Sequence, residues 1–284
     1  MLNENDVLDL KNLKRRFFYT HQNKSKILCV VDDYFSTTHK KIMSLIPHLS
    51  EFIVDVYSEC DLEKINDFSC FDAIWAFGTP ISKKYKNKNK TIIATCFNEL
   101  FSDCDFYNSI SCNNPEICTE KIFKTYDFVD LIEYGHDVLI ERRNFKVLVF
   151  DDSFKDKLKE SSIEFLDYKQ EKLKDPNDLY NECCLLLDFR SVLDSRILEA
   201  SACGVVSVTN NSGYCKYIKN KIVCENESDA ISKILNLKFK PKNLYNISKS
   251  ISKEMLFWDI KKISYQYEIF LNETVNKNSR FLFV

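Results

Sequence analysis

Short segments that are apolar almost throughout alternate with amphipathic segments along this chain. In the first half the apolar segments fall at residues 26–31, 52–57, 71–77 and 91–95, and an amphipathic helix is expected at 38–49. Strands without a polar face, separated by helices, are typical of a parallel sheet that helices cover on both sides. The alternation therefore predicts an α/β fold. It also excludes membrane spans, because no apolar run approaches the ~20 residues that a helix needs to cross a bilayer.

The same alternation starts again after residue 143. Strands are expected at 146–150, 162–166, 183–188, 205–208 and 221–224, and helices at 154–160, 178–182, 195–203 and 228–237. Two weaker strands are expected before this point, at 109–113 and 126–131, and a long amphipathic helix closes the chain. We therefore predict two α/β domains in series, at 1–143 and 144–257, followed by a C-terminal helix and tail at 258–284.

Charge and cysteine content exclude several classes of protein. The 40 Lys and Arg residues are balanced by 42 Asp and Glu residues, and the net charge of −2 gives no support for a nucleic-acid partner. The 12 cysteines lie mostly in apolar segments without metal-ligand spacing, so we expect neither a metal site nor disulfides. The N-terminus lacks the apolar core of a secretory signal. These features predict a cytoplasmic protein.

Five lysines, from Lys83 to Lys90, lie close together and are interleaved with asparagines. Such a run can bind an anionic membrane surface, which would make the protein peripheral on the inner face of the membrane. A solvated loop has the same composition, so both interpretations stay open at this point.

Two acids and a histidine follow the first predicted strand. Asp32 and Asp33 resemble the paired acids of phosphoacceptor receiver domains, but a receiver also needs an acid after its third strand, where this chain has Gly78. In open α/β sheets, ligands bind at the carboxyl ends of the strands. Asp33 and His39 are therefore candidate catalytic residues, with capping of the following helix as the alternative.

The segment 185–213 carries the strongest functional signal. A buried strand leads into a loop, and Asp194 or Ser195 is placed to cap the helix that follows. That helix ends at Gly204, the glycine expected in left-handed conformation after a helix, and a second buried strand comes next. The start of such a helix is a site for an anion such as a diphosphate.

Arg196 and Glu199 lie three residues apart, on one face of the first turns of this helix. The sequence from Arg196 to Gly204, Arg-Ile-Leu-Glu-Ala-Ser-Ala-Cys-Gly, resembles the nucleotide-sugar-binding domain of GT-B glycosyltransferases, in particular family four and its short spore-maturation-like relatives. The segment Thr209-Asn-Asn-Ser-Gly213 and the region around Trp258 are similar to later elements of the same family. The resemblance implies two Rossmann-like domains that face a cleft, with the helix and tail at 258–284 returning to the first domain.

This resemblance implies a hexosyltransferase-like enzyme that moves a sugar from a nucleotide diphosphate donor to a glycan, a lipid-linked acceptor or another biopolymer. Glu199 would accept the ribose hydroxyls of the donor, and Arg196 or Arg190 would neutralise its diphosphate. The other implied donor-binding residues are Ser191, Gly204, Ser212 and Gly213, whereas Asp33 and His39 would act on the acceptor side. Because guanidinium groups can stabilise the leaving diphosphate, neither a metal nor another cofactor is expected. The resemblance also implies that the reaction is retaining.

Three features depart from the family pattern. Ser191 stands where family-four enzymes carry a first glutamate, residues 33–39 replace a glycine-rich loop, and residues 96–99 stand where a histidine is expected. A second interpretation is therefore a GT-B protein that binds a nucleotide or a partner without catalysis. A third is an interaction protein that binds no nucleotide.

Overall fold

The structure is a computed structural model that describes residues 24–65, 67–79, 91–96, 106–109, 122–124, 127–135, 139–171, 174–191 and 194–275. The chain forms two compact units, one made of Met1–Thr125 and Ser264–Val284 and the other of Tyr126–Ile263. The predicted domain limits after residues 143 and 257 differ from these, because residues 126–143 and 258–263 belong to the second unit. Each unit contains a parallel sheet with helices, which confirms the predicted α/β class.

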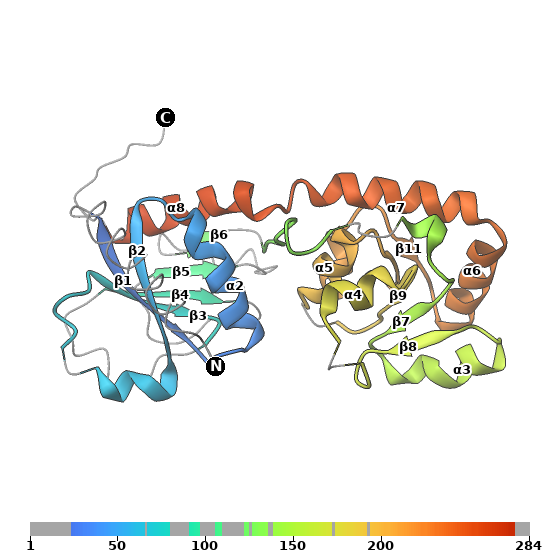
Figure 1. The fold of residues 1–284 in the computed structure, drawn as a ribbon, viewed down its shortest axis with the longest axis horizontal. Coiled ribbons are helices and arrows are strands. Elements are labelled where there is room, and N and C mark those ends of the chain that lie inside the picture. The colour runs from blue at the N-terminus through green and yellow to red at the C-terminus, as the bar shows by residue number, and fades with distance from the viewer. Residues whose placement is uncertain are drawn as a thin grey trace, which may run out of the picture. The chain divides into compact units, whose positions relative to one another are not determined.

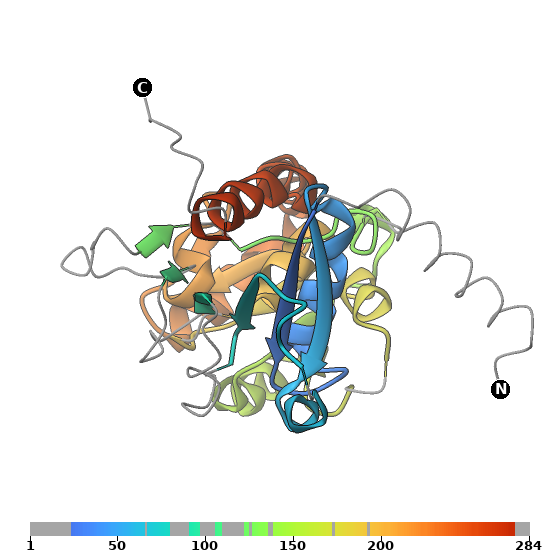
Figure 2. The same ribbon diagram turned by 90° about the vertical axis from the view of Figure 1, so that its left-hand side faces the viewer.

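The first unit is built on a six-stranded parallel sheet in the order β2-β1-β3-β4-β5-β6 (Figure 1). The strands are β1 Ser25–Val31, β2 Phe52–Ser58, β3 Ala73–Phe77, β4 Thr91–Cys96, β5 Phe106–Ser109 and β6 Ile122–Lys124. Helix α2 (Thr37–Leu45) continues into the 3-10 helix η1 (Ile46–His48), and η2 (Glu59–Lys64) follows β2. The unit also includes helix α8 (Ile260–Val275) from Ser264 onward, and Figure 2 turns it toward the viewer.

Apolar packing inside the first unit joins the beginning of the chain to its last helix. The strand residues Ile27 to Val31 are fully buried, as is the indole of Trp75, which donates to Thr95 Oγ1 at 2.8 Å. The ring of Tyr267 on α8 lies 6.2 Å from the ring of Trp75. The end of the sequence therefore completes the core of the first unit.

The two weaker predicted strands differ from the structure. β5 ends at Ser109, whereas residues 110–113 lie outside the described part of the chain. The prediction at 126–131 is wrong, because Val129 forms only an isolated parallel bridge, with Asp259. Both segments mix polar and apolar residues over a few positions, so their periodicity was too short to locate a strand.

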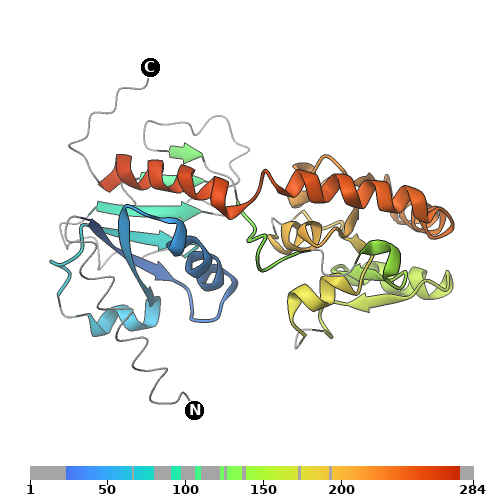
Figure 3. The same cartoon turned by 45° about the horizontal axis from the view of Figure 1, so that its top comes forward.

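The second unit holds a five-stranded parallel sheet in the order β11-β10-β9-β7-β8 (Figure 3). The strands are β7 Val147–Val149, β8 Phe165–Asp167, β9 Leu185–Leu187, β10 Val206–Thr209 and β11 Ile222–Val223. The chain places β8 on one side of β7 and the later strands on the other. In sheets of this kind, ligands bind at the carboxyl ends of the strands where the order reverses, which here lies between β7 and β9.

Eight α- and 3-10 helices are described in the second unit besides the start of α8. They are η5 Ile140–Arg142, α3 Lys155–Glu160, α4 Pro176–Asn181, α5 Arg196–Ala202, η7 Gly213–Lys216, α6 Glu227–Phe239 and α7 Pro241–Met255, and a further 3-10 turn, η6, spans Asp152–Phe154. Local polar groups begin and end several of them. Asp175 accepts the backbone N–H of Asn177 at the start of α4, and Gly204 follows α5 with a φ of 78°, as predicted. Helix α7 was not predicted.

Candidate functional site

The carboxyl ends of β7, β8 and β9 each place one side chain at the same edge of the second sheet. Phe150 directly follows β7, Tyr168 follows β8, and Asp188 follows β9. The parallel register pairs the last residue of β7 with the last residues of both neighbouring strands, so the residues that come next are also neighbours. This edge includes the point at which the strand order reverses.

Two arginines and two aspartates form a hydrogen-bonded cluster at this edge. Arg190 donates from Nε to Asp188 Oδ1 at 2.8 Å and from Nη2 to Asp188 Oδ2 at 3.0 Å. The same Nη2 atom donates to Asp194 Oδ2 at 3.0 Å. Arg196 donates from Nε to Asp194 Oδ1 at 2.7 Å and from Nη2 to Asp194 Oδ2. Asp194 thus bridges the two guanidinium groups.

Aromatic rings hold the other side of the two guanidinium groups. The guanidinium carbons of Arg190 and Arg196 lie 4.8 Å and 5.0 Å from the ring centre of Phe150. The Arg196 carbon is also 4.5 Å from the ring centre of Tyr168, which packs edge-on against Phe150 at 4.8 Å. Planar guanidinium groups stack well on aromatic faces, so both arginines have their orientations set before any ligand arrives.

The pKa values in the cluster reflect opposite effects of burial and charge. Burial by itself would raise the pKa of Asp194, but hydrogen bonding and the charge of Arg196 hold that pKa below its ordinary value of 3.8. Burial likewise acts to lower the pKa of Arg190, and the hydrogen bond and charge of Asp188 raise it overall. Asp194 and Arg190 are therefore both charged over the whole range in which proteins usually function.

Glu199 lies one turn further along α5 and is held by a tyrosine of α4. Tyr180 Oη donates to Glu199 Oε2 at 3.0 Å. The Tyr180 side chain is fully buried, and burial, together with the charge of Glu199, raises the pKa of its hydroxyl well above 10.0. The hydroxyl therefore stays protonated and acts as a donor, which orients one carboxylate oxygen of Glu199.

The buried side chain of Arg143 ties α4 and α5 together at their C-terminal ends. Its guanidinium donates to the carbonyl oxygens of Tyr180 at 3.2 Å, Cys183 at 2.9 Å and Cys203 at 2.7 Å. A cation at this position also balances the partial negative charge at the ends of both helices. The helices that carry Tyr180 and Glu199 are therefore braced against each other.

Three other predicted donor-site residues lie near the cluster, and one does not. Ser212 Oγ donates to the carbonyl oxygen of Arg190 at 3.0 Å, and Gly213 follows at the start of η7 with a φ of 55°. Ser191 is exposed in the loop directly after Arg190. Gly204, in contrast, follows the C-terminus of α5, at the end of the helix away from the cluster, and its carbonyl oxygen accepts from Ser248 Oγ at 2.6 Å.

Asp33 and His39 belong to the first unit, at the start of α2. The Nδ1 atom of His39 accepts the backbone N–H of Phe35 at 3.2 Å, so its neutral imidazole carries the proton on Nε2. Asp33 is exposed, and its backbone carbonyl accepts from Ser36, whose hydroxyl caps α2. Capping of this helix thus falls to Ser36. The lysines at 83–90 and residues 97–99 lie outside the described part of the chain.

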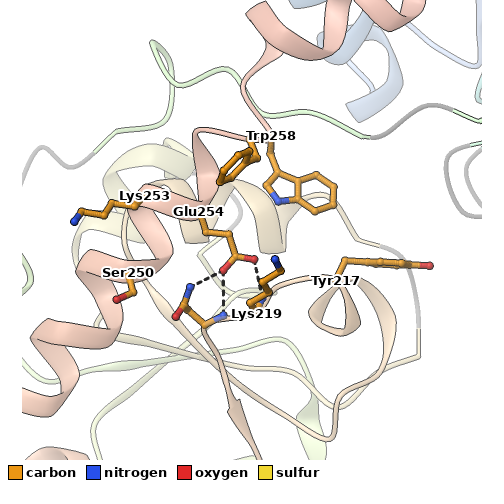
Figure 4. A pocket seen from close by; sticks show the side chains of 8 residues that line it. Tyr217, Lys219, Ser250, Lys253, Glu254 and Trp258 are labelled. Carbon is orange, nitrogen blue, oxygen red and sulfur yellow. Dashed lines mark hydrogen bonds between the residues drawn. The ribbon is translucent and has the colours of Figure 1, made fainter.

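A separate pocket of about 450 Å³ lies beside the C-terminal end of α7 (Figure 4). It is lined by Tyr217, Lys219, Asn220, Ser250, Lys253, Glu254, Phe257 and Trp258. In Figure 4, Trp258, Lys219 and Tyr217 lie on one side of Glu254, while Ser250 and Lys253 lie on the other. Lys219 and Asn220 precede β11, so this pocket is distinct from the cluster at the carboxyl ends of the strands.

The described part of the chain contains no group of three or more His, Cys, Asp or Glu side chains arranged to hold a metal ion. In that same part, none of the helices combines the length and the apolar character needed to cross a membrane.

The sequence prediction missed four residues that contact the two arginines or Glu199. They are Phe150, Tyr168, Asp188 and Tyr180, and Asp194 was assigned only as a helix cap. The first three each follow a buried parallel strand directly, which is a usable signal because carboxyl ends of such strands meet at one edge. For Tyr180 the sequence offers no comparable signal, since its contact with Glu199 depends on how two helices pack.

No protein-family model and no curated protein sequence matches this chain. Several solved structures are similar to it. A glycosyltransferase from Rickettsia africae ESF-5 has a TM-score of 0.65 at 13% identity, over 90% of this chain and 100% of that one. The N-terminal domain of Candida albicans trehalose-6-phosphate phosphatase has a TM-score of 0.58 at 8% identity, over 90% and 97%. AviGT4, a glycosyltransferase involved in avilamycin A biosynthesis, has a TM-score of 0.55 at 11% identity, over 89% and 98%.

These likenesses establish the fold, a pair of Rossmann-like α/β units of the GT-B type. They extend over both units, since each covers about nine-tenths of the chain. The fold expected from the segment 196–204 is therefore confirmed.

Proposed function

We propose that this protein is a glycosyltransferase that transfers a sugar from a nucleotide diphosphate donor to a glycan, a lipid-linked acceptor or another biopolymer. The observation that carries the proposal is the arrangement of Arg190, Arg196 and Glu199 at the edge of the second sheet where such folds bind ligands. Similar folds in proteins described as glycosyltransferases support it.

The arginine pair is proposed to bind the diphosphate of the donor. Arg190 uses Nε and Nη2 for its two aspartates, and its Nη1 atom has no acceptor among the described residues. A guanidinium edge of this kind can donate to phosphate oxygens. As the bond between sugar and diphosphate breaks, negative charge grows on the leaving diphosphate, and two oriented guanidinium groups would stabilise that charge. On this proposal the step requires no metal, and the configuration of the sugar is retained.

Glu199 is proposed to bind the ribose of the donor. Tyr180 donates to one oxygen of the carboxylate and thereby fixes the orientation of the Glu199 side chain. A carboxylate can accept hydrogen bonds from two neighbouring hydroxyl groups, which is the pattern that a ribose offers. Recognition of the ribose and of the diphosphate would then come from residues of one helix and the loop before it.

We propose that His39 donates a hydrogen bond to the acceptor substrate. Because its Nδ1 atom accepts the Phe35 backbone N–H, the neutral ring can donate from Nε2 to a substrate oxygen but cannot take up a proton there. The exposed carboxylate of Asp33 is the remaining candidate acceptor of a proton in that loop.

Calorimetric titration with a panel of nucleoside diphosphates and nucleotide sugars tests the donor site. Glu199→Gln is expected to lower the affinity for the best-binding donor roughly 100-fold, because two hydrogen bonds to a charged group are lost or weakened. Tyr180→Phe, which removes only the hydroxyl that orients Glu199, should give a smaller loss. Glu182→Gln is the matched control, since Glu182 lies at the end of α4 and pairs with the half-exposed Lys174.

Equal donor affinity in the parent and the Glu199→Gln variant would contradict the assignment of Glu199. Assays of donor hydrolysis and sugar transfer then separate the catalytic from the non-catalytic interpretation. Tight binding with neither hydrolysis nor transfer would identify a nucleotide-binding protein without turnover, the alternative that Ser191 raises. No binding by any nucleotide would contradict the proposed function as a whole.

A further inference from the structure

None of the residues that line the pocket beside α7 belongs to the proposed donor or acceptor site. Three of its eight lining residues are aromatic, Tyr217, Phe257 and Trp258, and two are lysines, Lys219 and Lys253. Its volume of about 450 Å³ is within the range of sites that bind small organic molecules, roughly 300–1,000 Å³. The pocket therefore offers both apolar surface and positive charge to a ligand.

The apolar side of the pocket continues onto the protein surface. Phe257 is 73% exposed and its neighbour Leu256 is 51% exposed. The ammonium group of Lys262 lies 5.3 Å from the centre of the Phe257 ring. Exposed apolar surface therefore continues from the edge of the pocket over Leu256 and Phe257, beside the cation of Lys262.

Positive charge predominates along the two segments that form the pocket. Residues 217–220 and 249–262 contain the lysines Lys219, Lys249, Lys253, Lys261 and Lys262, against the two acids Glu254 and Asp259. The balance of charge thus favours an anionic ligand.

Both acids of these segments are already engaged with the backbone. The nearly buried carboxylate of Glu254 accepts from the backbone N–H groups of Lys219 at 2.7 Å and Asn220 at 3.0 Å, and from Asn220 Nδ2 at 2.8 Å. Asp259 Oδ1 accepts the backbone N–H of Lys261 at 3.3 Å at the start of α8. Among the described residues, neither carboxylate forms an ion pair with a lysine of the pocket, so these acids do not draw the ammonium groups away from a ligand.

We propose that this pocket binds an anionic amphiphile, a molecule with a phosphate or similar anionic group attached to an apolar chain. The apolar chain would lie against Phe257 and Trp258. The anionic group would be attracted by the positive charge of Lys219 and Lys253, which line the pocket, and of Lys262, whose ammonium group lies beside Phe257. An inorganic anion would leave the exposed aromatic and aliphatic surface without a function, and a neutral hydrocarbon would not use the lysines. The proposal does not depend on the glycosyltransferase activity.

Titration with three soluble probes tests the chemistry of the pocket. Dodecyl phosphate, below its micellar concentration, combines the two features of the proposed ligand; inorganic phosphate carries only the charge and dodecyl maltoside only the chain. We expect dodecyl phosphate to bind and the other two to bind at least tenfold more weakly. Equal binding of dodecyl maltoside would overturn the role of the lysines, and equal binding of inorganic phosphate would overturn the role of the aromatic surface.

Substitutions locate the binding. Phe257→Ser is expected to weaken the binding of dodecyl phosphate roughly tenfold, because it removes a large apolar contact. The double variant Lys253→Gln with Lys262→Gln should weaken this binding roughly fivefold for each lysine. The matched controls are Phe239→Ser and the pair Lys240→Gln with Lys242→Gln, at the other end of α7. Phe239 is 79% exposed and also has lysine neighbours, but it does not line the pocket. Equal losses in both sets would overturn the assignment to the pocket.

Trp258 provides a local signal for the same titration. The chain contains two tryptophans, and Trp75 is fully buried in the first unit. In a Trp75→Phe background, dodecyl phosphate should shift Trp258 emission to shorter wavelength as the indole loses water. If that variant does not fold, iodide quenching of the parent gives the same information, because Trp258 is the half-exposed tryptophan. Binding without any change at Trp258 would overturn the proposal.

Flotation with vesicles distinguishes the two sources of such a ligand. Vesicles of phosphatidylcholine with added phosphatidylglycerol present anionic lipid in a bilayer, and pure phosphatidylcholine vesicles are the neutral comparison. If the parent protein floats with the anionic vesicles but not with the neutral ones, and the Phe257→Ser variant floats with neither, the ligand is a membrane lipid. Binding of dodecyl phosphate without flotation would assign it to a soluble amphiphile. Absence of both would overturn the proposal.

Discussion

Asp194 sets the positions of two other side chains. Its Oδ2 atom accepts from Arg190 and Arg196, and its Oδ1 atom also accepts the backbone N–H of Arg196 at 3.2 Å. Ser195 occupies the cap position of α5 without a side-chain bond to the helix, so Asp194 supplies the polar contact there. A residue that the sequence marked as a helix cap is therefore also the bridge between two guanidinium groups.

We expect Asp194→Asn to destabilise the protein by about 3 kcal/mol at neutral pH, because it leaves a nearly buried ion pair without its carboxylate. The pKa of Asp194 is lower in the folded protein than its ordinary value of 3.8, so the unfolded chain binds more protons in acid. The stabilisation is therefore fully present above about pH 4 and is lost as the pH falls through the lowered pKa. Urea unfolding of parent and variant from pH 3 to pH 7 measures this.

The difference in free energy of unfolding between the parent and the Asp194→Asn variant should therefore become smaller only at the acidic end of that pH series. A difference that stays constant down to the lowest pH would show that the carboxylate does not gain its stabilisation from the folded cluster. Glu182→Gln serves again as the control, and its curve should remain close to that of the parent at every pH.

Residues that lie together in the chain were predictable, and those that meet only through folding were not. Arg190, Arg196 and Glu199 fall within ten residues of sequence, and a single strand–loop–helix pattern identified them. Phe150 and Tyr168 come from other strands, and only the parallel order of β7, β8 and β9 places them beside the arginines. The charged residues proposed to bind the donor were therefore predictable from the sequence, whereas the aromatic residues that orient them were not.

At the level of elements, α4 and α5 act as a braced pair. Arg143 lies just before the second sheet begins, yet its guanidinium reaches carbonyl oxygens at the ends of both helices. The carbonyls of Cys183 and Cys203 follow the last turns of the two helices, and the Tyr180 carbonyl, in the last turn of α4, also accepts the backbone N–H of Cys183 at 3.2 Å. The contact between Tyr180 and Glu199 depends on this arrangement, because the two residues lie on different helices.

Arg143→Met should lower the free energy of unfolding by about 3 kcal/mol, because several buried carbonyl oxygens lose a charged donor. Arg142→Met is the control, since the neighbouring Arg142 is exposed. Urea unfolding compares the two variants. Losses of the same size in both would contradict the bracing role of Arg143.

Helix α7 shows why one long element escaped prediction. Its buried positions are Leu244, Ser248, Ile251, Glu254 and Met255, so polar residues interrupt the apolar stripe. Ser248 is tolerated in the interior because its hydroxyl donates to the Gly204 carbonyl oxygen at 2.6 Å. A prediction from hydrophobic periodicity assigns polar residues such as Ser248 to the exposed face of a helix. The burial of Ser248 is explained by its hydrogen bond to another part of the fold, which the sequence does not reveal. The strands that are apolar throughout, in contrast, were located to within a few residues.

For the whole molecule, the last helix is a structural part of the first unit. From Ser264 onward α8 belongs with the residues before 126, and Tyr267, Phe270 and Leu271 are almost fully buried there. The carboxylate of Glu268 also accepts from the hydroxyl of Ser50 at 2.9 Å. The core of the first unit is therefore assembled from both ends of the sequence.

Tyr267→Ala is expected to destabilise the first unit by about 4 kcal/mol, because it opens a cavity beside Trp75. Hydrogen exchange should show faster exchange in β1 and β3, while β7 and β9 of the second unit stay protected. Tyr265→Ala is the matched control, because Tyr265 is 66% exposed on the same helix. Equal loss of protection in both units would show that they unfold as one body.

The division of the chain also orders its folding during synthesis. Residues 126–263 form an uninterrupted segment and can complete their sheet as soon as they leave the ribosome, whereas residues 1–125 must wait for 264–275. The unit that begins the protein is thus the last to be finished. During that interval the apolar side chains beneath α8, Trp75 among them, depend on other protection, so a chaperone that binds nascent chains should engage the first unit longer than the second.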